Sequence, residues 1–301
     1  MAKQEPVSLL EFQERFATEE ACHEHLFQMR WPDGFRCPHC GGERYYWLPA
    51  RRLYQCVRCR HQVSVTAGTV FHRSRIPLRK WFWAIFLFMH DKRGTSAMLI
   101  SRTLKIRYET AWFMLHKIRQ AMQSREEQYQ LQGLVEMDDG YFGGVDHGRD
   151  GRGVKTPRVI VAVGISKKRP TYAKMAVVKS ISKDEIAGFT KKACHAEAII
   201  KTDGHGSYRV LDEIGLKHLE VVTKHHPDGA AAFPYVHTLI SNAKAWLLGT
   251  FHGGVRPQYL SRYLNEFCYR FNRRAFNAEG FNRLLHVCAN KGPTTYAELT
   301  G

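Results

Sequence analysis

Carboxylates stand directly after two apolar segments of the chain, where hydrophobic residues give way to glycine-rich turns. "VEMDDGYFGG" carries Asp138 and Asp139, and "AIIKTDGHGSY" carries Asp203. Surface turns explain such acids as readily as a metal site does, because Asp-Gly pairs are common in turns. If the two segments were neighbouring strands, their acids would converge on a divalent cation that positions an attack on a phosphodiester. Alternation places Glu136 and Asp138 on one face and Asp139 on the other, so only one of the adjacent aspartates points inward.

Four cysteines have the spacing of a zinc site. Cys37, Cys40, Cys56 and Cys59 form C-x2-C-x15-C-x2-C. Each C-x2-C pair lies in one tight turn and supplies two thiolates, so the two pairs together can bind a zinc ion tetrahedrally. Four thiolates fill the coordination sphere and leave no place for a reacting water. The alternative is a redox-active C-x2-C pair. The presence of two C-x2-C pairs with arginines among them fits that alternative poorly. We therefore predict one structural zinc ion, with the nearby histidines facing solvent.

The charge of the chain indicates a polyanionic partner. Its 301 residues include 45 Lys and Arg against 28 Asp and Glu, a net charge of +17, and residues 36–119 hold 17 basic and 3 acidic residues. Such a concentration is typical of nucleic-acid binding. The longest apolar run, Trp81–Met89, is too short to span a bilayer, and the first residues lack a signal-peptide core. We expect a cytoplasmic protein without a membrane span.

Periodicity indicates the elements that position these residues. A capping box at Ser8 and Glu11 predicts N-terminal helices, and residues 36–68 alternate like small antiparallel strands. Helices are expected over the apolar run, 97–103 and 108–122, with helix-turn-helix rhythm. Three successive strands follow from residue 134, then a helix over 183–196, a strand ending at Asp203, a strand at 218–223, and helices from 235 onward. This order predicts an α/β domain with a mixed sheet.

Basic side chains mark two candidate DNA-binding surfaces. In the ribbon they are interleaved with aromatic residues, which suits phosphate contacts, although a solvated basic face with aromatics in the core is the alternative. In the helix-turn-helix, the third helix is the candidate for a major groove. The candidate residues are Arg44, Arg51, Arg52, Arg58 and Arg60 in the ribbon, and Lys105, Arg107, Lys117 and Arg119 in the helical region.

A third segment, "YVHTLISNAKAWLLGTFHGG", resembles the helix that completes the site of DDE-type transposases of the ribonuclease H-like fold, in particular the ISXO-type group of bacterial insertion sequences. The zinc ribbon, "VEMDDGYFGG", "KTDGHGSY" and this helix occur in the family's order, and the resemblance covers about residues 15–290. It implies that Asp138, Asp203 and Asn242 are the metal ligands, with Asn242 where many relatives have Glu, as in a subgroup of the family that is active with Asn and Lys at these places. Lys244 would be the basic member of the same helix.

Some residue roles stay open at this stage. The choice between Asp138 and Asp139 is not settled, because both are acids. An amide at Asn242 can ligate a hard cation but brings no charge and cannot act as a base, so metal affinity would be weaker until substrate phosphate joins. Lys244 would counter negative charge at the phosphoryl group, or is an ordinary solvated lysine. His237 could touch DNA or the surroundings of the site.

The resemblance implies a multidomain α+β protein. The expected domains are N-terminal helices at 1–30, a zinc ribbon at 31–72, a helix-turn-helix DNA-binding region at 73–130, and a ribonuclease H-like catalytic domain with a mixed sheet and C-terminal helices at 131–301. The expected cofactors are one structural zinc and two catalytic Mg²⁺ or Mn²⁺ ions. The expected partners are double-stranded DNA, as terminal repeats and target, and further copies of the chain.

The expected activity is that of a bacterial, nucleoid-associated DNA transposase that cleaves and transfers strands with metal ions. The first alternative is an inactive, transposase-derived zinc-ribbon regulator in which Asn242 marks a dead site. A tyrosine recombinase would form a covalent DNA adduct, but no convincing Arg-His-Arg-Tyr set is present. A general nuclease of the same fold would digest DNA without the element's ends.

Overall fold

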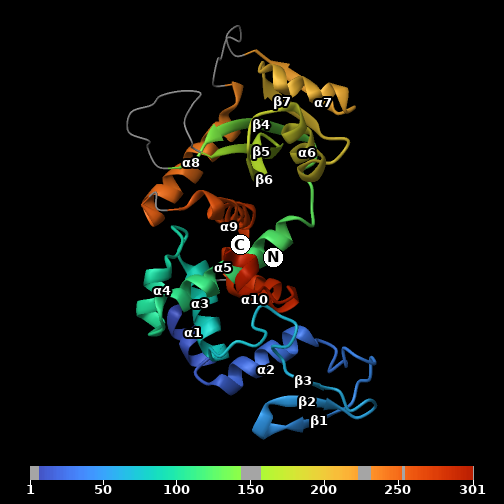
Figure 1. Cartoon of the computed structure of the whole chain (residues 1–301), viewed down its shortest axis with the longest axis vertical. Helices are drawn as coiled ribbons and strands as arrows, with labels where there is room; N and C mark the ends of the chain where they lie inside the picture. Colours follow the sequence, from blue (N-terminus) through green and yellow to red (C-terminus); the bar gives the residue numbers. More distant parts are fainter. Residues whose placement is uncertain (1–6, 144–156, 223–231, 253–254, 301) are drawn as a thin grey trace. The chain divides into compact units, whose positions relative to one another are not determined.

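The computed structural model describes residues 7–143, 157–222, 232–252 and 255–300 (Figure 1). Its internal contacts divide the chain into two compact units. The first consists of residues 1–122 and 276–301, and the second of residues 123–275. Each unit has its own core and is described by itself.

The first unit begins with two short helices and a three-stranded sheet. Helix α1 (Leu9–Arg15) starts at the predicted capping box, in which Ser8 N donates to Glu11 Oε2 at 2.7 Å and Glu11 N donates to Ser8 Oγ at 3.2 Å. Helix α2 (Glu19–Arg30) follows. Strands β1 (Tyr45–Leu48), β2 (Leu53–Cys56) and β3 (Gln62–Val63) pair antiparallel in that order, with the 3-10 turn η1 (Pro49–Arg51) between the first two. The ribbon has the small antiparallel strands that the sequence predicts.

Three helices follow the ribbon, as the periodicity predicts. They are α3 (Leu78–His90), α4 (Ala97–Leu104) and α5 (Tyr108–Glu126). Lys105 ends α4 in the left-handed conformation, at φ 48°, and the chain turns there toward α5. A short turn between two helices at this point is what the predicted helix-turn-helix requires.

The C-terminal helices α10 (Gly280–Asn290) and α11 (Tyr296–Thr300) belong to the first unit. Helix α10 packs on α2 and α3. The Phe281 ring centroid lies 5.0 Å from that of Phe12 and 5.4 Å from that of Phe16, in an aromatic core. The expected catalytic domain spans 131–301, whereas these contacts group residues 276–301 with the N-terminal helices.

The second unit is built on a five-stranded mixed sheet. Its strands are β4 (Leu134–Tyr141), β5 (Arg158–Ser166), β6 (Arg169–Val178), β7 (Ile199–Asp203) and β8 (Lys217–Val221), in the order β6-β5-β4-β7-β8. β4, β5 and β6 pair antiparallel, and β7 runs parallel to both β4 and β8. The predicted antiparallel meander therefore forms one half of the sheet and the later strands the other.

Helices cover both faces of this sheet (Figure 1). On one face α8 (Pro234–Phe251) and α9 (Leu260–Asn272) pack against Val159, Val161 and Val163 of β5. On the other face α6 (Lys183–Ala193) and α7 (Val210–Glu213) pack against Ile160 and Ala162. The remaining short 3-10 turns are η2 (Gly206–Arg209), η5 (Pro257–Tyr259) and η6 (Arg274–Glu279). Burial on both faces explains why β5 reads as a continuous apolar run.

The predicted fold class is confirmed: the protein is α+β, with a cysteine-bearing ribbon and a mixed sheet. In the part of the chain that the structure describes, no helix has both the length and the apolar character to cross a membrane.

Candidate active site and metal centre

The strand register brings Asp138 and Asp203 level with each other. β4 and β7 are parallel neighbours, paired Leu134↔Ile199 through Glu136↔Lys201. Two residues beyond the last pair, β4 reaches Asp138 and β7 reaches Asp203. Parallel neighbours lie about 4.8 Å apart, and alternate residues share a face. The register therefore places these two carboxylates side by side at the C-terminal ends of two central strands.

Alternation also separates the two adjacent aspartates. Asp138 Oδ2 lies 3.0 Å from His237 Nε2, on the face that α8 covers. Asp139 accepts a hydrogen bond of 3.2 Å from the buried Tyr208 hydroxyl, on the face that α6 and α7 cover. Asp138 is therefore the member of the pair that shares a face with Asp203, a choice that alternation alone leaves open.

Burial and like charge act together on Asp138. Desolvation raises the pKa of its carboxyl, and the neighbouring carboxylates of Asp139 and Asp203 raise it further. The backbone N–H of Asp139, which donates to Asp138 Oδ1 at 2.8 Å, and the His237 ring lower it. Desolvation likewise raises the pKa of Asp139. A cluster of acids held together against their repulsion is what a bound cation would relieve.

This electrostatic strain predicts a stabilising substitution. A carboxyl whose pKa is raised on folding favours the folded state at low pH and loses that contribution as the pH rises through the raised pKa. Asp138→Asn removes the charge at every pH, so it should raise the melting temperature of the metal-free protein at pH 7. The gain should shrink as the pH falls from 7 through the raised pKa, where the wild-type carboxyl takes up a proton. Calorimetry across this pH range checks the prediction, and a lower melting temperature at pH 7 would contradict it.

A second buried carboxylate fixes the start of α8. Glu136, two residues before Asp138 and only 2% exposed, accepts hydrogen bonds of 3.0 Å from the backbone N–H groups of both Tyr235 and Val236. A carboxylate at a helix N-terminus satisfies unpaired donors and complements the helix dipole. Glu136 thereby ties α8 to the strand that carries Asp138. Strand alternation predicts the face on which Glu136 lies, but the sequence indicates no role for it.

The face of α8 turned to Asp138 carries His237 and Lys244. These residues are seven apart, which is about two helical turns, so they share one side of the helix. The Lys244 ammonium lies 5.6 Å from the centre of the Phe142 ring, just beyond the end of β4. Asn242 is exposed and lies about 140° around the helix from His237. The structure thus brings Asp138, Asp203 and His237 together, with Lys244 on the same side of α8, whereas Asn242 lies on another flank of the helix.

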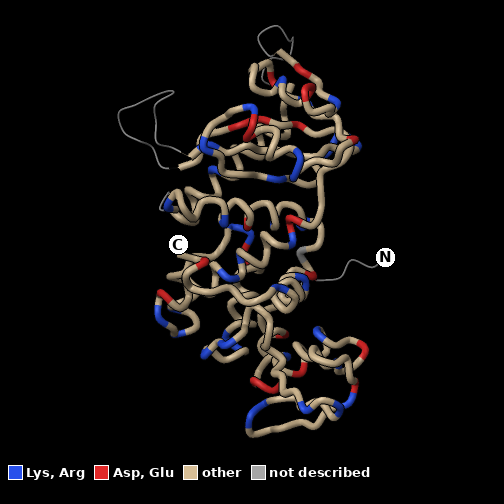
Figure 2. Tube along the Cα trace, turned by 45° about the vertical axis from the view of Figure 1, so that its right-hand side comes forward, with Lys and Arg blue, Asp and Glu red and all other residues tan. Residues whose placement is uncertain are grey.

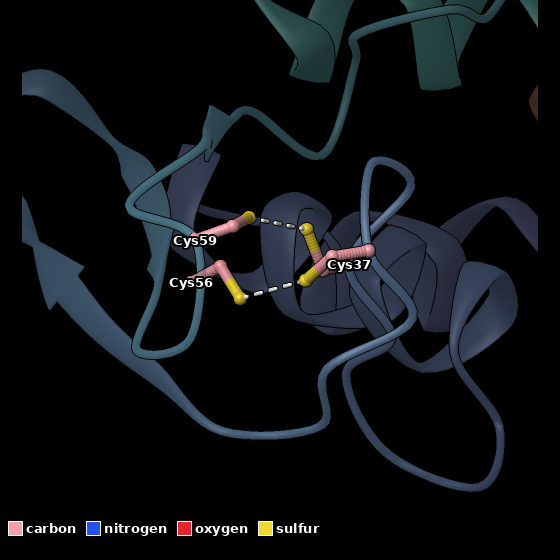
Figure 3. A group of neighbouring side chains, drawn as sticks. Cys37, Cys56 and Cys59 are labelled. Carbon is pink, nitrogen blue, oxygen red and sulfur yellow. Dashed lines mark hydrogen bonds between the residues drawn. The ribbon is translucent and has the colours of Figure 1, made fainter.

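The four ribbon cysteines form a compact group (Figure 3). Their sulfur atoms all lie within 4.8 Å of one another, and Sγ of Cys37 is 3.6 Å from that of Cys59, as Cys40 Sγ is from Cys56 Sγ. A tetrahedral zinc with bonds of about 2.3 Å requires sulfur separations of about 3.8 Å. Hydrogen bonds, the largest from the backbone N–H of Cys59, lower the pKa of the Cys56 thiol to about 7, whereas burial and the neighbouring thiols raise the pKa of Cys59 to about 12. The donor set fits one structural zinc ion.

The ribbon's basic surface is exposed, while its aromatics divide between surface and core. Arg44, Arg51, Arg52, Arg58 and Arg60 are all exposed, although Arg52 pairs with Glu20 at 2.8 Å. Tyr46 is 54% exposed, and Tyr45 and Trp47 are exposed as well, whereas Tyr54 is buried. Both interpretations of the aromatics therefore hold, each for different residues. Figure 2 shows Lys and Arg in the ribbon and along the helices, with Asp and Glu among them.

Two of the predicted DNA contacts in the helical region need correction. Lys117 is 7% exposed and Arg119 is 1% exposed, so neither presents its charge to a duplex in this structure. Their cations lie near the rings of Phe113 and Phe88, at 4.9 Å and 5.6 Å from the centroids. Lys105 and Arg107, together with Tyr108 and Glu109 at the start of α5, are exposed. The middle of α5 is core, which leaves its N-terminal end as the accessible part.

Comparison with known families follows the same division of the chain. Residues 130–272 match the family model of the ISXO2-like transposase domain, and residues 17–62 match that of the transposase zinc-ribbon domain. A protein in the transposable element ISH50 of Halobacterium salinarum, itself described as uncharacterized, is 26% identical over 293 residues, which are 90% of this chain and 96% of that protein.

Similarity to solved structures is weak. A chain of the simian T-cell lymphotropic virus intasome, in complex with the PP2A regulatory subunit B56 gamma, gives a TM-score of 0.34 at 10% identity over 62% of this chain and 67% of that one. A chain of the pre-cleavage Mos1 transpososome gives 0.28 at 10% identity, over 67% and 76%. TM-scores this low do not establish a shared fold.

The second unit combines a mixed sheet in the order 3-2-1-4-5, helices on both faces, and acids at the ends of its two central parallel strands. The family models assign this part of the chain to a class of domain. The chain contains an ISXO2-like transposase domain over residues 130–272 and, ahead of it, a transposase zinc-ribbon domain over residues 17–62.

Proposed function

We propose that the chain acts in the cytoplasm as the transposase of an insertion sequence, cutting its terminal repeats and joining them to target DNA. The observation that carries this proposal is the β4–β7 register, which sets Asp138 level with Asp203 on the face covered by α8. Bound Mg²⁺ or Mn²⁺ ions, two in number, would supply an activated oxygen nucleophile and stabilise charge at the scissile phosphate. Asp138 and Asp203 would hold these ions through carboxylate oxygens, the donors that such cations prefer.

The α8 residues have separate proposed roles. His237 is placed to donate from Nε2 to Asp138 and so to orient the carboxylate, as hydrogen-bonding partners of metal ligands commonly do. Lys244 would counter charge on the phosphate. Asn242, the ligand that the family resemblance suggests, would need α8 to rotate by about 140° before its side chain faced the aspartates.

DNA recognition is assigned to the first unit. The exposed ribbon arginines would grip phosphates, and Lys105, Arg107 and the first turn of α5 would meet the terminal repeat. Joining two element ends requires that both be held together, so we propose that the chain works as a homo-oligomer. Binding should weaken steeply with salt, since each neutralised phosphate contributes about −0.9 to the log-log slope.

One assay tests the proposed function against its alternatives. Full-length protein is incubated with Mg²⁺ and DNA that carries or lacks the element's ends, and cleaved, joined and protein-linked products are separated. Cleavage and joining that depend on the ends support the transposase. Binding without cleavage indicates the inactive regulator, the second candidate, which the position of Asn242 favours. Digestion of DNA that lacks the ends indicates a nuclease. A covalent protein–DNA adduct indicates a tyrosine recombinase.

The placement of α8 predicts which of its polar residues matters. His237→Ala should reduce cleavage about 10- to 100-fold, the usual loss when a partner that orients a metal ligand is removed, and should raise the Mg²⁺ concentration for half-maximal rate. Asn242→Ala should stay within about threefold of wild type, because an exposed change away from the site has little effect. Rates measured over a Mg²⁺ series decide between them. The reverse pattern would restore Asn242 as the third ligand and overturn the role of His237.

A further inference from the structure

A chain of hydrogen bonds leads from the protein surface to the residue directly before Asp203. It begins at Asp212 in α7, passes through His218 in β8 and ends at Thr202 in β7. His218 Nδ1 lies 2.9 Å from Asp212 Oδ2, and His218 Nε2 lies 2.7 Å from Thr202 Oγ1. Thr202 Oγ1 is also 3.0 Å from the carbonyl oxygen of Asp203. None of these three residues was singled out from the sequence.

The inner part of the chain is shielded from water. Thr202 is 0% exposed, and the His218 side chain is 2% exposed, whereas the Asp212 side chain is 60% exposed. Thr202 lies on the face of the sheet that α6 and α7 cover, opposite to the face on which Asp203 points. A buried hydroxyl costs free energy unless it is hydrogen-bonded, so His218 is what makes a threonine acceptable there.

Counting protons shows that His218 holds the Thr202 oxygen in either of its protonation states. The Asp212 carboxylate only accepts, so Nδ1 of His218 must carry a proton. If Nε2 is unprotonated, the Thr202 hydroxyl donates to it. If Nε2 also carries a proton, it donates to Thr202 Oγ1, and the hydroxyl proton can then go to the Asp203 carbonyl. In both arrangements the hydrogen bond between the Thr202 and His218 side chains joins the end of β7 to β8, in addition to the backbone hydrogen bonds between the two strands.

The end of β7 is where such fastening affects Asp203. Asp203 is the last residue of the strand, and its Oδ1 already accepts from the backbone N–H of His205 at 3.1 Å. The direction of its carboxylate therefore depends on the peptide that joins it to Thr202. Since a carboxylate must be aimed to within fractions of an ångström to share a metal, a fixed neighbour improves binding without touching the ion.

We propose that Asp212, His218 and Thr202 form a positioning chain that aims Asp203 at the metal. The inference rests on the proposed function, because it takes Asp203 as a metal ligand. A role in packing alone would be met by valine, which has the shape of threonine, at this buried position. The hydroxyl and the two residues that hold it are needed only if the exact orientation of the strand end matters.

The test compares Thr202→Val, which keeps the shape, with Thr202→Ser, which keeps the hydroxyl. Thr190→Val is the matched control, because Thr190 is also 0% exposed in the second unit but donates within α6 to Ile186 O at 2.7 Å. Mn²⁺ affinity of the full chain without DNA is measured from the electron paramagnetic resonance of free Mn²⁺, alongside melting temperature and cleavage rate. His218→Gln and the Thr202→Val/His218→Gln double variant complete the set.

Thr202→Val should weaken Mn²⁺ binding about tenfold or more, while Thr202→Ser and Thr190→Val stay near wild type. The double variant should bind Mn²⁺ no more weakly than the weaker-binding of its two single variants, because both substitutions interrupt the same series of hydrogen bonds. Equal Mn²⁺ affinity in Thr202→Val and Thr190→Val would overturn the proposal, as would a Thr202→Ser as weak as Thr202→Val. Asp203→Asn distinguishes failure of the proposed function from failure of the positioning chain. If Asp203→Asn binds Mn²⁺ like wild type, the proposed function itself fails. If it binds Mn²⁺ more weakly, the variants of Thr202 and His218 decide on the positioning chain.

Discussion

Asp203→Asn should abolish cleavage of end-containing DNA, to about 1,000-fold or more below wild type. The change keeps the size of the side chain and one oxygen, but it removes the charge that we propose holds a cation at the end of β7. Metal ions contribute several kcal/mol of charge stabilisation to such reactions, and about 4 kcal/mol corresponds to this factor in rate. DNA binding without metal should be unchanged, because the DNA contacts are assigned to the first unit.

The matched control for this prediction is Asp184→Asn. Asp184 is an exposed aspartate in the first turn of α6, on the face opposite α8, and has no part in the proposed site. It should cleave at the wild-type rate, so any loss in Asp203→Asn is due to position and not to net charge. Single-turnover cleavage in Mg²⁺ and binding in EDTA provide the two measurements. Cleavage by Asp203→Asn at a rate near that of the control would remove Asp203 from the reaction.

Cys56→Ser should release the zinc and unfold the ribbon. Strands β1, β2 and β3 have 4, 4 and 2 residues, which is too few for a stable fold without a bound metal ion or a disulfide. Structural zinc sites contribute about 10–16 kcal/mol at neutral pH, which exceeds what such a small module gains by packing. The wild-type chain should therefore hold one zinc, and the variant should hold none and be cut by protease within residues 31–72.

Cys22→Ala is the control for the zinc prediction. Cys22 is a buried cysteine in α2 that lies outside the group of four, so its loss should lower stability without releasing metal. Colorimetric zinc determination after thiol modification, together with limited proteolysis, gives the readout. If Cys56→Ser retained a full equivalent of zinc and the wild-type proteolysis pattern, the ribbon would not depend on the metal.

Features that depend on local spacing could be predicted from the sequence. The two C-x2-C knuckles define the cysteine group because each knuckle is closed within a few residues. Strand alternation alone separates Asp138 from Asp139, and the structure places them on opposite faces as expected. The three helices after the ribbon and the strands of the sheet begin and end close to the predicted residues.

Features that depend on which elements meet could not be predicted. Phe281 joins the core formed by Phe12 and Phe16, and no local pattern says that a C-terminal helix packs against the first one. The basic side chains of Lys117 and Arg119 looked like DNA contacts, but the middle of α5 is covered by other helices of its unit. The chain from Asp212 to Thr202 needs the parallel pairing of β7 with β8, which the sequence does not specify.

The rotation of α8 lies between these two cases. Its buried positions, Val236, Leu239, Ile240, Ala243 and Leu247, follow helical periodicity and could have shown that His237 and Asn242 lie on different flanks. Which flank faces Asp138 depends on tertiary packing, and the bonds from Glu136 to the start of the helix fix it. A family motif identifies the helix but does not by itself identify the side chain that reaches the site.

Asp138 and Asp203 are proposed to share a divalent metal at the ends of β4 and β7. Anomalous scattering from crystals of the full chain with end-containing DNA and Mn²⁺ tests it directly. We expect an anomalous peak at about 2 Å from a carboxylate oxygen of each aspartate, with a DNA phosphate in its coordination sphere. Manganese bound elsewhere in a complex that cleaves its DNA in the same buffer would contradict the account.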